Sequence, residues 1–186
     1  RIYNIYPTGS NAGYVVSSGI RTTTTAGVIA SIYNNMIRLG YDKSGAAVTT
    51  SAEFRGISEM VNGTVDAIFN TVLIGGTGVV AATKSSYGYY SNSTSSATRL
   101  IENNIFQNDR AGSSGKHYAI RLTNITNTTC NYNNLVSASG YIGNWNGTDK
   151  ATLANWQGAA SGLDAKSKNV PTPYQAAIAI TPDLHF

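Results

Sequence analysis

The stretch Tyr-Asn-Asn-Leu-Val at residues 132–136 is the last of five copies of one short pattern, on which the fold prediction rests. An aromatic residue, once replaced by Glu, is followed by Asn, by one short polar or apolar residue and then by apolar residues. The earlier copies begin at Tyr3, Tyr33, Phe69 and Glu102. Counted from the leading Asn, successive copies lie 30, 36, 33 and 30 residues apart, which is a repeat with loops of variable length.

Each later copy follows a short apolar stretch, and turns rich in Gly, Ser, Thr and Asn separate the copies, as at residues 75–78 and 111–115. Such short strand pieces cannot bury an apolar face alone, whereas the stacked coils of a solenoid bury a continuous apolar column. The repeat therefore predicts a solenoid of short strands.

The leading Asn has a physical reason to recur. At a coil corner, Asn tolerates left-handed backbone angles and hydrogen-bonds to nearby backbone groups. Stacked every ~4.8 Å, its amide also donates to the equivalent amide on one side and accepts from the one on the other side. We therefore predict a ladder of five asparagines: Asn4, Asn34, Asn70, Asn103 and Asn133.

A β-sandwich with Asn-Asn hairpin turns is the alternative fold. A hairpin would favour Asn-Gly between its strands, and the copies lack it, while apolar residues follow the asparagines directly. We expect an all-β fold, a right-handed parallel β-helix of about five or six coils with a short helix near the C-terminal end. Residues 1–186 would form a single domain with coil marks near 4, 34, 70, 103 and 133, and residues 145–186 would close it.

The predicted helix spans Thr152 to Gly158, with Thr152 as its cap. It would lie on the end or side of the solenoid and shield strand edges that could pair with other chains. The sequence starts directly in the strand-like residues 2–6, so we expect it to be a piece of a longer chain.

Composition excludes several classes of protein. Charged residues make up only 12% of the chain, and the net charge of +4 is spread without a Lys/Arg cluster, which argues against nucleic-acid binding. No apolar run approaches the ~18 residues of a membrane span. The chain has a single cysteine, Cys130, so it contains no internal disulfide. We expect Cys130 to be a small buried side chain. The Asn/Ser/Thr-rich, Lys-poor composition is typical of secreted or cell-surface bacterial proteins.

Four segments resemble coils of right-handed parallel β-helix proteins of the pectate-lyase-like architecture, and most of all those of large secreted Bacteroidetes proteins. They are IYNNMIRLG (32–40), IFNTVLIGG (68–76), IENNIFQND (101–109) and YNNLVSASG (132–140). The closing segment is similar to the end of such domains, with Trp156-Gln157, Gly162-Leu163-Asp164 and Asp183-Leu184-His185. In one departure, Pro171-Thr172-Pro173-Tyr174 stands where the family has a Pro-Phe pair. The resemblance implies a secreted or cell-surface module, exported by the type IX route, whose partners are other modules of the same chain and the secretion machinery.

Enzymes of this architecture cleave polysaccharides, and the hydrolases need two carboxylates within ~5–10 Å. The best candidates for a catalytic cluster are Glu102 and Asp66 with Arg99 nearby, although an ordinary Arg99–Glu102 surface pair is the simpler interpretation. His117 and His185 lack metal-ligand spacing with each other or with Cys130, so we expect no metal site and no cofactor.

Four aromatic residues are candidate sugar-stacking groups, since an aromatic face packs on a pyranose ring. They are Tyr87, Tyr89, Tyr90 and Trp145, and the competing interpretation places them as stacked core or side-wall residues. We therefore expect a non-catalytic structural or adhesion module that presents a rigid wall to a glycan, a surface or a partner. A polysaccharide lyase or glycoside hydrolase of β-helix type is the alternative function.

Overall fold

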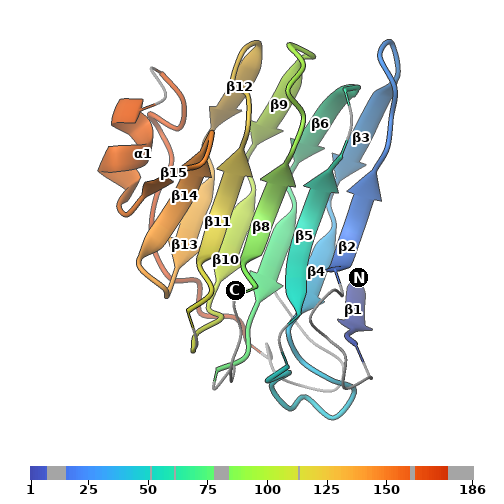
Figure 1. The fold of residues 1–186 in the computed structure, drawn as a ribbon, viewed down its shortest axis with the longest axis vertical. Coiled ribbons are helices and arrows are strands. Elements are labelled where there is room, and N and C mark those ends of the chain that lie inside the picture. Colours follow the sequence, from blue (N-terminus) through green and yellow to red (C-terminus); the bar gives the residue numbers. More distant parts are fainter. Residues whose placement is uncertain are drawn as a thin grey trace.

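The chain folds into a parallel β-solenoid, seen in a computed structural model that describes residues 1–7, 16–50, 52–60, 62–77, 84–112, 114–159 and 162–175. Its strands form three sheets, called here walls A, B and C, that run the length of the molecule (Figure 1). All pairings between coils are parallel, so the predicted all-β parallel β-helix is confirmed. The β-sandwich alternative is wrong, because it requires antiparallel neighbours.

Each wall is assembled from strands that lie far apart in sequence. Wall A contains β1 (Ile2–Ile5), β4 (Met36–Leu39), β7 (Thr71–Ile74), β10 (Ile105–Asn108) and β13 (Asn134–Ser137). Wall B contains β2 (Val16–Thr22), β5 (Glu53–Glu59), β8 (Ser86–Ser91), β11 (His117–Leu122), β14 (Tyr141–Trp145) and β15 (Thr148–Lys150). Wall C contains β3 (Ile29–Tyr33), β6 (Thr64–Ile68), β9 (Arg99–Glu102) and β12 (Thr128–Asn131).

Each coil passes through wall B, then wall C, then wall A. Figure 1 shows the chain rising along the near wall B, returning behind it and advancing toward β14, which is a right-handed winding. The predicted number of five or six coils is too high. Wall C has only four strands, so four coils have all three walls within the described residues, with β1 and β14 adding partial coils at the ends.

Register places equivalent side chains above one another. In wall A, Ile37 pairs with Val72, Val72 with Phe106 and Phe106 with Leu135, and all four are fully buried. Each such side chain contributes about 1.5–3 kcal/mol when it leaves water. Stacking of the coils thus builds the core column that no single coil could bury, and Cys130 lies in it as predicted.

An asparagine ladder runs inside the corner where wall C turns into wall A. The Nδ2 of Asn35 donates to Oδ1 of Asn70 (3.0 Å), that of Asn70 to Asn104 (3.0 Å), and that of Asn104 to Asn133 (3.1 Å). The same oxygens accept the backbone N–H of the preceding coil's asparagine at 2.9–3.1 Å. The ladder ends on Asp164, whose Oδ1 accepts from Asn133 at 3.1 Å.

The ladder differs from the predicted one in three coils. It is shifted by one residue in two of them, and the predicted member Asn4 accepts from Nη2 of Arg38 at 3.1 Å instead of joining the ladder. Asn70 and Asn133 are members, but Asn35 and Asn104 take the places predicted for Asn34 and Asn103. Asn34 and Asn103 stand one residue earlier with φ of 55° and 56°, at the left-handed corner itself, and Asn4 has φ 59°. The left-handed corner residue and the ladder residue are therefore consecutive in the chain. An Asn-Asn pair provides both, with the first Asn at the corner and the second in the ladder.

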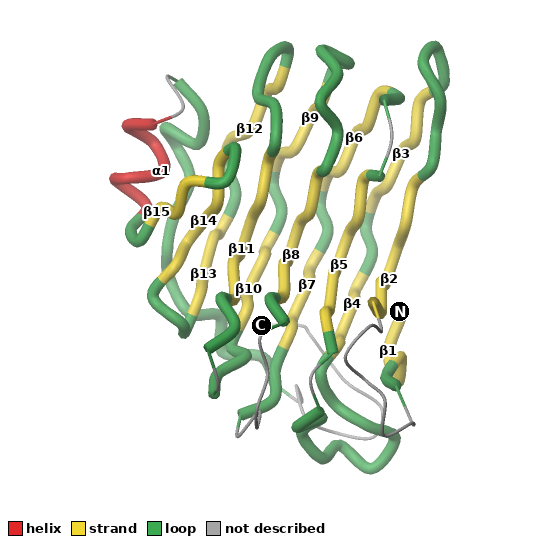
Figure 2. Tube along the Cα trace, viewed as in Figure 1, coloured by secondary structure: helices red, strands yellow, loops and turns green. Residues whose placement is uncertain are grey.

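The C-terminal end is closed by a hairpin and a helix (Figure 2). β15 pairs antiparallel with β14, and α1 (Leu153–Ala159) confirms the predicted helix, with Thr152 Oγ1 accepting the N–H of Asn155 at 3.1 Å. Trp156 is fully buried and donates from Nε1 to Oδ2 of Asp164 at 2.7 Å. The Trp-Gln and Gly-x-Asp motifs of the closing segment therefore hold Asp164 at the end of the ladder, since Trp156 and Gln157 both donate to it. Asp183-Leu184-His185 lies outside the described residues.

A column of glycines lets walls A and B approach each other. Gly19, Gly56 and Gly88 occupy one position of wall B in successive coils, and a Cβ on Gly56 would lie 2.3 Å from Cγ1 of Val72. The alternation of inward and outward side chains along β8 is interrupted at Gly88. Tyr87 and Tyr90 are three residues apart, yet their rings belong to one outer cluster. This column was not among the predictions, although Gly stands between two larger residues in three successive coils and the equivalent residue of the next coil is the small Ala119.

Replacement of Asn104 by Ala is expected to lower the free energy of unfolding by about 2–4 kcal/mol. The change removes the acceptor of the backbone N–H and Nδ2 of Asn70, together with the Nδ2 donor to Oδ1 of Asn133 and to the carbonyl of Ala67. The backbone N–H of residue 104 still donates to Asn133, but each buried polar atom left without a partner costs about 1–3 kcal/mol. Urea unfolding measures the loss. The control is Asn103→Gly, whose left-handed backbone suits glycine and which should cost less than ~1 kcal/mol. Equal losses in the two variants would contradict the ladder.

Candidate functional site

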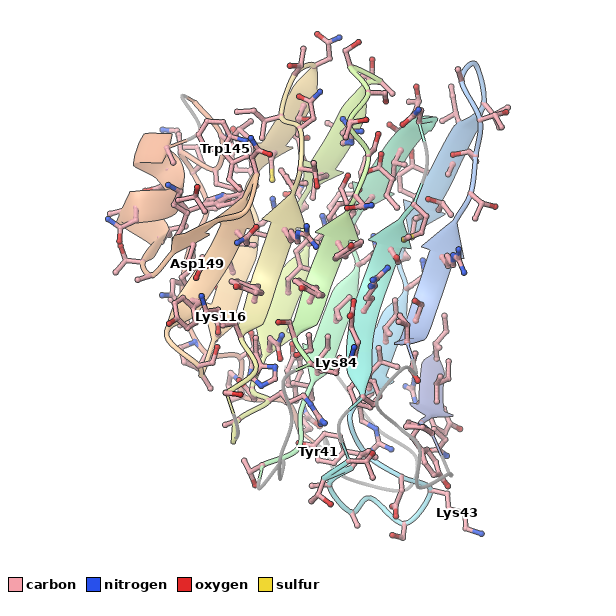
Figure 3. The ribbon with its side chains drawn as sticks, in the orientation of Figure 1. Tyr41, Lys43, Lys84, Lys116, Trp145 and Asp149 are labelled. Carbon is pink, nitrogen blue, oxygen red and sulfur yellow. The ribbon has the colours of Figure 1, made fainter. Side chains whose placement is uncertain are left out.

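The strongest candidate for a binding site is a hollow beside Trp145, at the end of the solenoid where wall B turns into wall C (Figure 3). Trp145 is the last residue of β14, and the tight turn through Asn146 and Gly147, with φ of 46° and 81°, leads into β15. Positive φ at both central residues is the geometry for which Asn-Gly is suited. The hollow measures about 380 Å³ and is lined by Thr94, Thr123, Asn124, Ile125, Thr126, Trp145 and Asn146.

Hydrogen bonds between coils fix the polar side of this hollow. Nδ2 of Asn124 donates to the carbonyl oxygens of Thr94 and Ser95 at 2.8 and 3.1 Å, and its Oδ1 accepts the N–H of Thr126 at 2.9 Å. Oγ1 of Thr123 donates to the carbonyl of Ser91 at 3.0 Å. Three successive turns thus contribute to one preorganised surface.

The lining combines one half-buried indole with hydroxyl and amide groups and contains no ionisable side chain. An aromatic face packs on the apolar face of a sugar ring, while hydroxyls and amides bond to its oxygens. The chemistry of the hollow therefore suits a neutral sugar.

Two of the three predicted tyrosines, Tyr87 and Tyr90, form a closed stack with Tyr118 on the outside of wall B. The rings of Tyr87 and Tyr118 are stacked at 5.5 Å, Tyr87 meets Tyr90 edge-on at 4.8 Å, and Arg55 and Arg121 lie over the Tyr90 ring at 3.7 and 4.8 Å. Tyr87 and Tyr90 are only 8% and 5% exposed. Their faces are occupied by neighbours, so the structure favours the side-wall interpretation.

Tyr118 connects this stack to a small polar group at the end of wall B. Its hydroxyl donates to Oδ1 of Asp149 at 2.8 Å, and Lys116 forms an ion pair with the same carboxylate (Figure 3). Burial, followed by the charge and hydrogen bond of Asp149, raises the pKa of Tyr118. The phenol therefore stays protonated and acts as a donor at neutral pH.

Tyr89 lies on the opposite side of the same strand, inside the solenoid. Its ring is fully buried, and its hydroxyl donates to Oε2 of Glu59 at 3.3 Å. Burial raises the pKa of this phenol far above its usual value. Tyr89 is therefore a core residue with no face open to a ligand.

Arg99 is also inside the solenoid, where its Nε lies 2.9 Å from each carboxylate oxygen of Glu59 and its Nη1 donates to Ala97 O at 3.1 Å. The predicted Arg99–Glu102 surface pair is wrong, since Arg99 is fully buried and alternates with Glu102 along β9. Glu59, which the sequence analysis did not single out, is its partner from the neighbouring coil. Only the register between coils, which pairs β5 with β8 in wall B and β6 with β9 in wall C, brings these two charges together.

Asp66 and Glu102 do share the outer face of wall C. Asp66 pairs in register with Leu100, two residues before Glu102 on the adjacent strand, so the two carboxylates are diagonal neighbours. Tyr33 Oη donates to Asp66 at 3.4 Å. Arg99 points the other way and is not part of this pair, so the predicted three-residue cluster does not assemble.

His117 belongs to a buried polar group at the start of β11. Its Nδ1 lies 2.9 Å from Oγ of Ser86, which also bonds to the side chain of Asn108, and His117 is 1% exposed. Burial, with a smaller effect from the charge of Arg110, lowers the pKa of His117 to about 4. The imidazole is therefore neutral at pH 7, and the buried Ser86 is closed to a substrate.

The class of the protein follows from this geometry: it is a parallel β-solenoid with a capped C-terminal end and a polar hollow containing Trp145. In comparisons with known proteins, no family model, no curated protein and no solved structure matches the chain. The helix found among the described residues, α1, has seven residues and is too short to cross a bilayer.

Replacement of Arg99 by Met is expected to destabilise the fold by about 3–5 kcal/mol, because Glu59 becomes an unpaired buried charge. The double variant R99M/E59Q removes that charge and keeps an acceptor for Tyr89, so it should recover a large part of the loss. Thermal unfolding of both variants measures this. No recovery in the double variant would contradict a role for Arg99 as the partner of Glu59.

Stability should fall as pH decreases from about 6.5 to about 4. The unfolded histidine binds a proton near pH 6.5, whereas folded His117 binds one only near pH 4, so the unfolded state is favoured by protonation across this interval. The contribution is present above pH 6.5 and amounts to about 3 kcal/mol when fully lost. Urea unfolding at several pH values measures it, and the variant His117→Gln should lack this component. An unchanged pH dependence in the variant would contradict the assignment.

Proposed function

We propose that the chain is a non-catalytic adhesion module of a secreted or cell-surface bacterial protein, and that it holds a neutral glycan in the hollow at Trp145. The observation that carries this proposal is the lining itself, an aromatic ring set among hydroxyls and amides without an ionisable side chain. A site built to hold a neutral sugar needs stacking and hydrogen bonds and no general acid or base.

The solenoid supports such a role because it is rigid and presents the hollow at one of its edges. Lining residues come from the turns after β8, β11 and β14, whose spacing is set by the hydrogen bonds between strands of wall B. A ligand in the hollow would therefore meet side chains that are ordered before it binds, which reduces the entropic cost of binding.

Low charge and an Asn/Ser/Thr-rich surface support the extracellular location, and the closing segment supports kinship with the β-helix modules of Bacteroidetes proteins. In that setting the export route would be type IX secretion, and other modules of the longer chain would be the neighbours of this one. The full-length sequence tests this part, since it should contain a signal peptide and a C-terminal sorting domain.

Glycoside hydrolysis is the second candidate function, and one observation favours it. Asp66 and Glu102 lie on adjacent strands of one outer wall, at the diagonal position where side chains are ~7–8 Å apart. Carboxyl groups of inverting hydrolases stand at a similar separation. Release of reducing ends from a polysaccharide, abolished in Glu102→Gln, would establish this function and contradict the adhesion module.

Replacement of Trp145 by Ala is expected to weaken the binding of a neutral oligosaccharide about tenfold, because loss of aromatic stacking costs up to about 1.5 kcal/mol. Isothermal titration with cello-, xylo- and manno-oligosaccharides measures the affinity. Trp145→Phe keeps an aromatic face and should retain part of it. Tyr33→Ala removes an exposed aromatic residue on wall C and serves as the control. Equal affinities for the parent and Trp145→Ala would contradict the hollow as the site.

A further inference from the structure

One corner of the solenoid displays aromatic side chains in a backbone conformation that disfavours them. Where wall C turns into wall A, each of the four complete coils has one residue with positive φ: Asn34 (55°), Phe69 (58°), Asn103 (56°) and Tyr132 (55°). Asn adopts this conformation readily, but in a bulky residue the Cβ lies too close to the backbone carbonyl oxygen, which strains the chain. Two coils therefore use the favourable residue, and two use an aromatic one.

Packing does not explain the two aromatic residues. Phe69 is 58% exposed and Tyr132 is 56% exposed. Within the described part of the chain, neither ring takes part in a ring–ring or cation–ring contact. A strained backbone that holds an exposed apolar ring gains nothing for folding, and strain of this kind is characteristic of functional sites.

The two rings are spaced regularly along the solenoid axis. Phe69 belongs to the second complete coil and Tyr132 to the fourth, so two strand spacings of ~4.8 Å place them roughly 10 Å apart. Asn103 stands between them in the third coil. Phe69 and Asn103 each donate a backbone N–H to the next coil at 3.3 Å, which holds the row in place. The arrangement is aromatic, amide, aromatic, over a length comparable to a disaccharide unit.

Polar groups flank this row on both sides. Asp66 and Glu102 lie on the adjoining outer face of wall C. On the other side, Tyr132 borders a hollow of about 370 Å³, lined also by Asn103, Asn104, Ile105, Asn133, Asn134, Lys166 and Lys168. Two carboxylates and two ammonium groups leave the surroundings of the row without net charge.

We propose that Phe69, Asn103 and Tyr132 form a second glycan-binding site, which takes an extended neutral polysaccharide lying along the solenoid axis. Sugar rings two positions apart stack on Phe69 and Tyr132, and the amide of Asn103 bonds to the hydroxyls between them. The carboxylate of Glu102, next to Asn103 in the chain, accepts from hydroxyls at the edge. This site lies at a different corner from the Trp145 hollow and does not depend on it.

The pattern favours a glycan over other macromolecules. A protein-docking patch is contiguous and apolar, whereas here an amide separates the two rings. A polyanion would gain no net electrostatic attraction, since Asp66 and Glu102 offset Lys166 and Lys168. A neutral sugar chain alternates apolar ring faces with hydroxyls, which is the order of groups in the row.

The test uses the double variant F69N/Y132N, which gives these corners the residue found at Asn34 and Asn103. The variant should melt at the parent's temperature or above it, because Asn suits the left-handed backbone. Affinity for soluble neutral polysaccharides, namely hydroxyethyl cellulose, xyloglucan and galactomannan, should fall at least about tenfold in affinity electrophoresis. Tyr132→Phe keeps both ring faces and should retain binding, and Tyr33→Ala, which removes an exposed ring of wall C outside the row, should leave affinity for the polymers largely intact.

Several results would overturn this site. They are parent-like polymer binding by F69N/Y132N, marked destabilisation of that variant, absence of polymer binding by the parent, or a preference of the parent for polygalacturonate. A specific protein partner lost in F69N/Y132N, without polymer binding, would also overturn it. The two proposals are separable: polymer binding lost in Trp145→Ala alone would support the hollow and contradict the corner row, and the reverse would support the row.

Discussion

The structure depends on the alignment of one coil above the next, and the asparagine ladder is the interaction that specifies it. Each interior ladder amide binds the coil on either side and a carbonyl of wall C, as Asn104 does with Asn70, Asn133 and the oxygen of Ala67. A slip of one residue would break these bonds and would turn the buried columns outward. Asp164 completes the series with a carboxylate that Trp156 and Ser167 also bind. The ladder thus defines register, and the cap defines where the register ends.

Both proposed binding surfaces follow from that register. The hollow at Trp145 exists only because turns from three successive coils lie side by side, and the row of Phe69, Asn103 and Tyr132 exists only because equivalent corners are stacked. The tyrosines of wall B show the opposite outcome. Stacking brings their rings together so closely, with arginines over Tyr90, that they stabilise the wall and leave no face for a ligand.

Much of this architecture was predictable because its causes are local. The aromatic-Asn pattern indicated the coils, the helix after Thr152 followed from its cap, and the place of Cys130 in the core followed from its character. The ladder members were harder to predict, because Asn34 and Asn35 are the same type of residue and only their backbone angles distinguish the corner residue from the ladder residue. Glu59 could not be found as the partner of Arg99, since the two are 40 residues apart and meet through coil register. The glycine column was visible in the sequence, but its meaning, a close approach of walls A and B, required the third dimension.

The repeat by itself favoured a parallel solenoid, since short strand pieces with equivalent polar corners bury their apolar residues when coil stacks on coil. Tertiary structure alone decided which of those residues face outward, and which outward residues keep a side chain exposed to solvent or a ligand. Tyr87 and Tyr89 are two residues apart and would share a face of a regular strand, yet one is on the wall and the other in the core, because the strand changes its alternation at Gly88. Exposure of Phe69 and closure of Tyr87 likewise depend on what the adjacent coils place beside them, and that is a property of stacking rather than of any single segment.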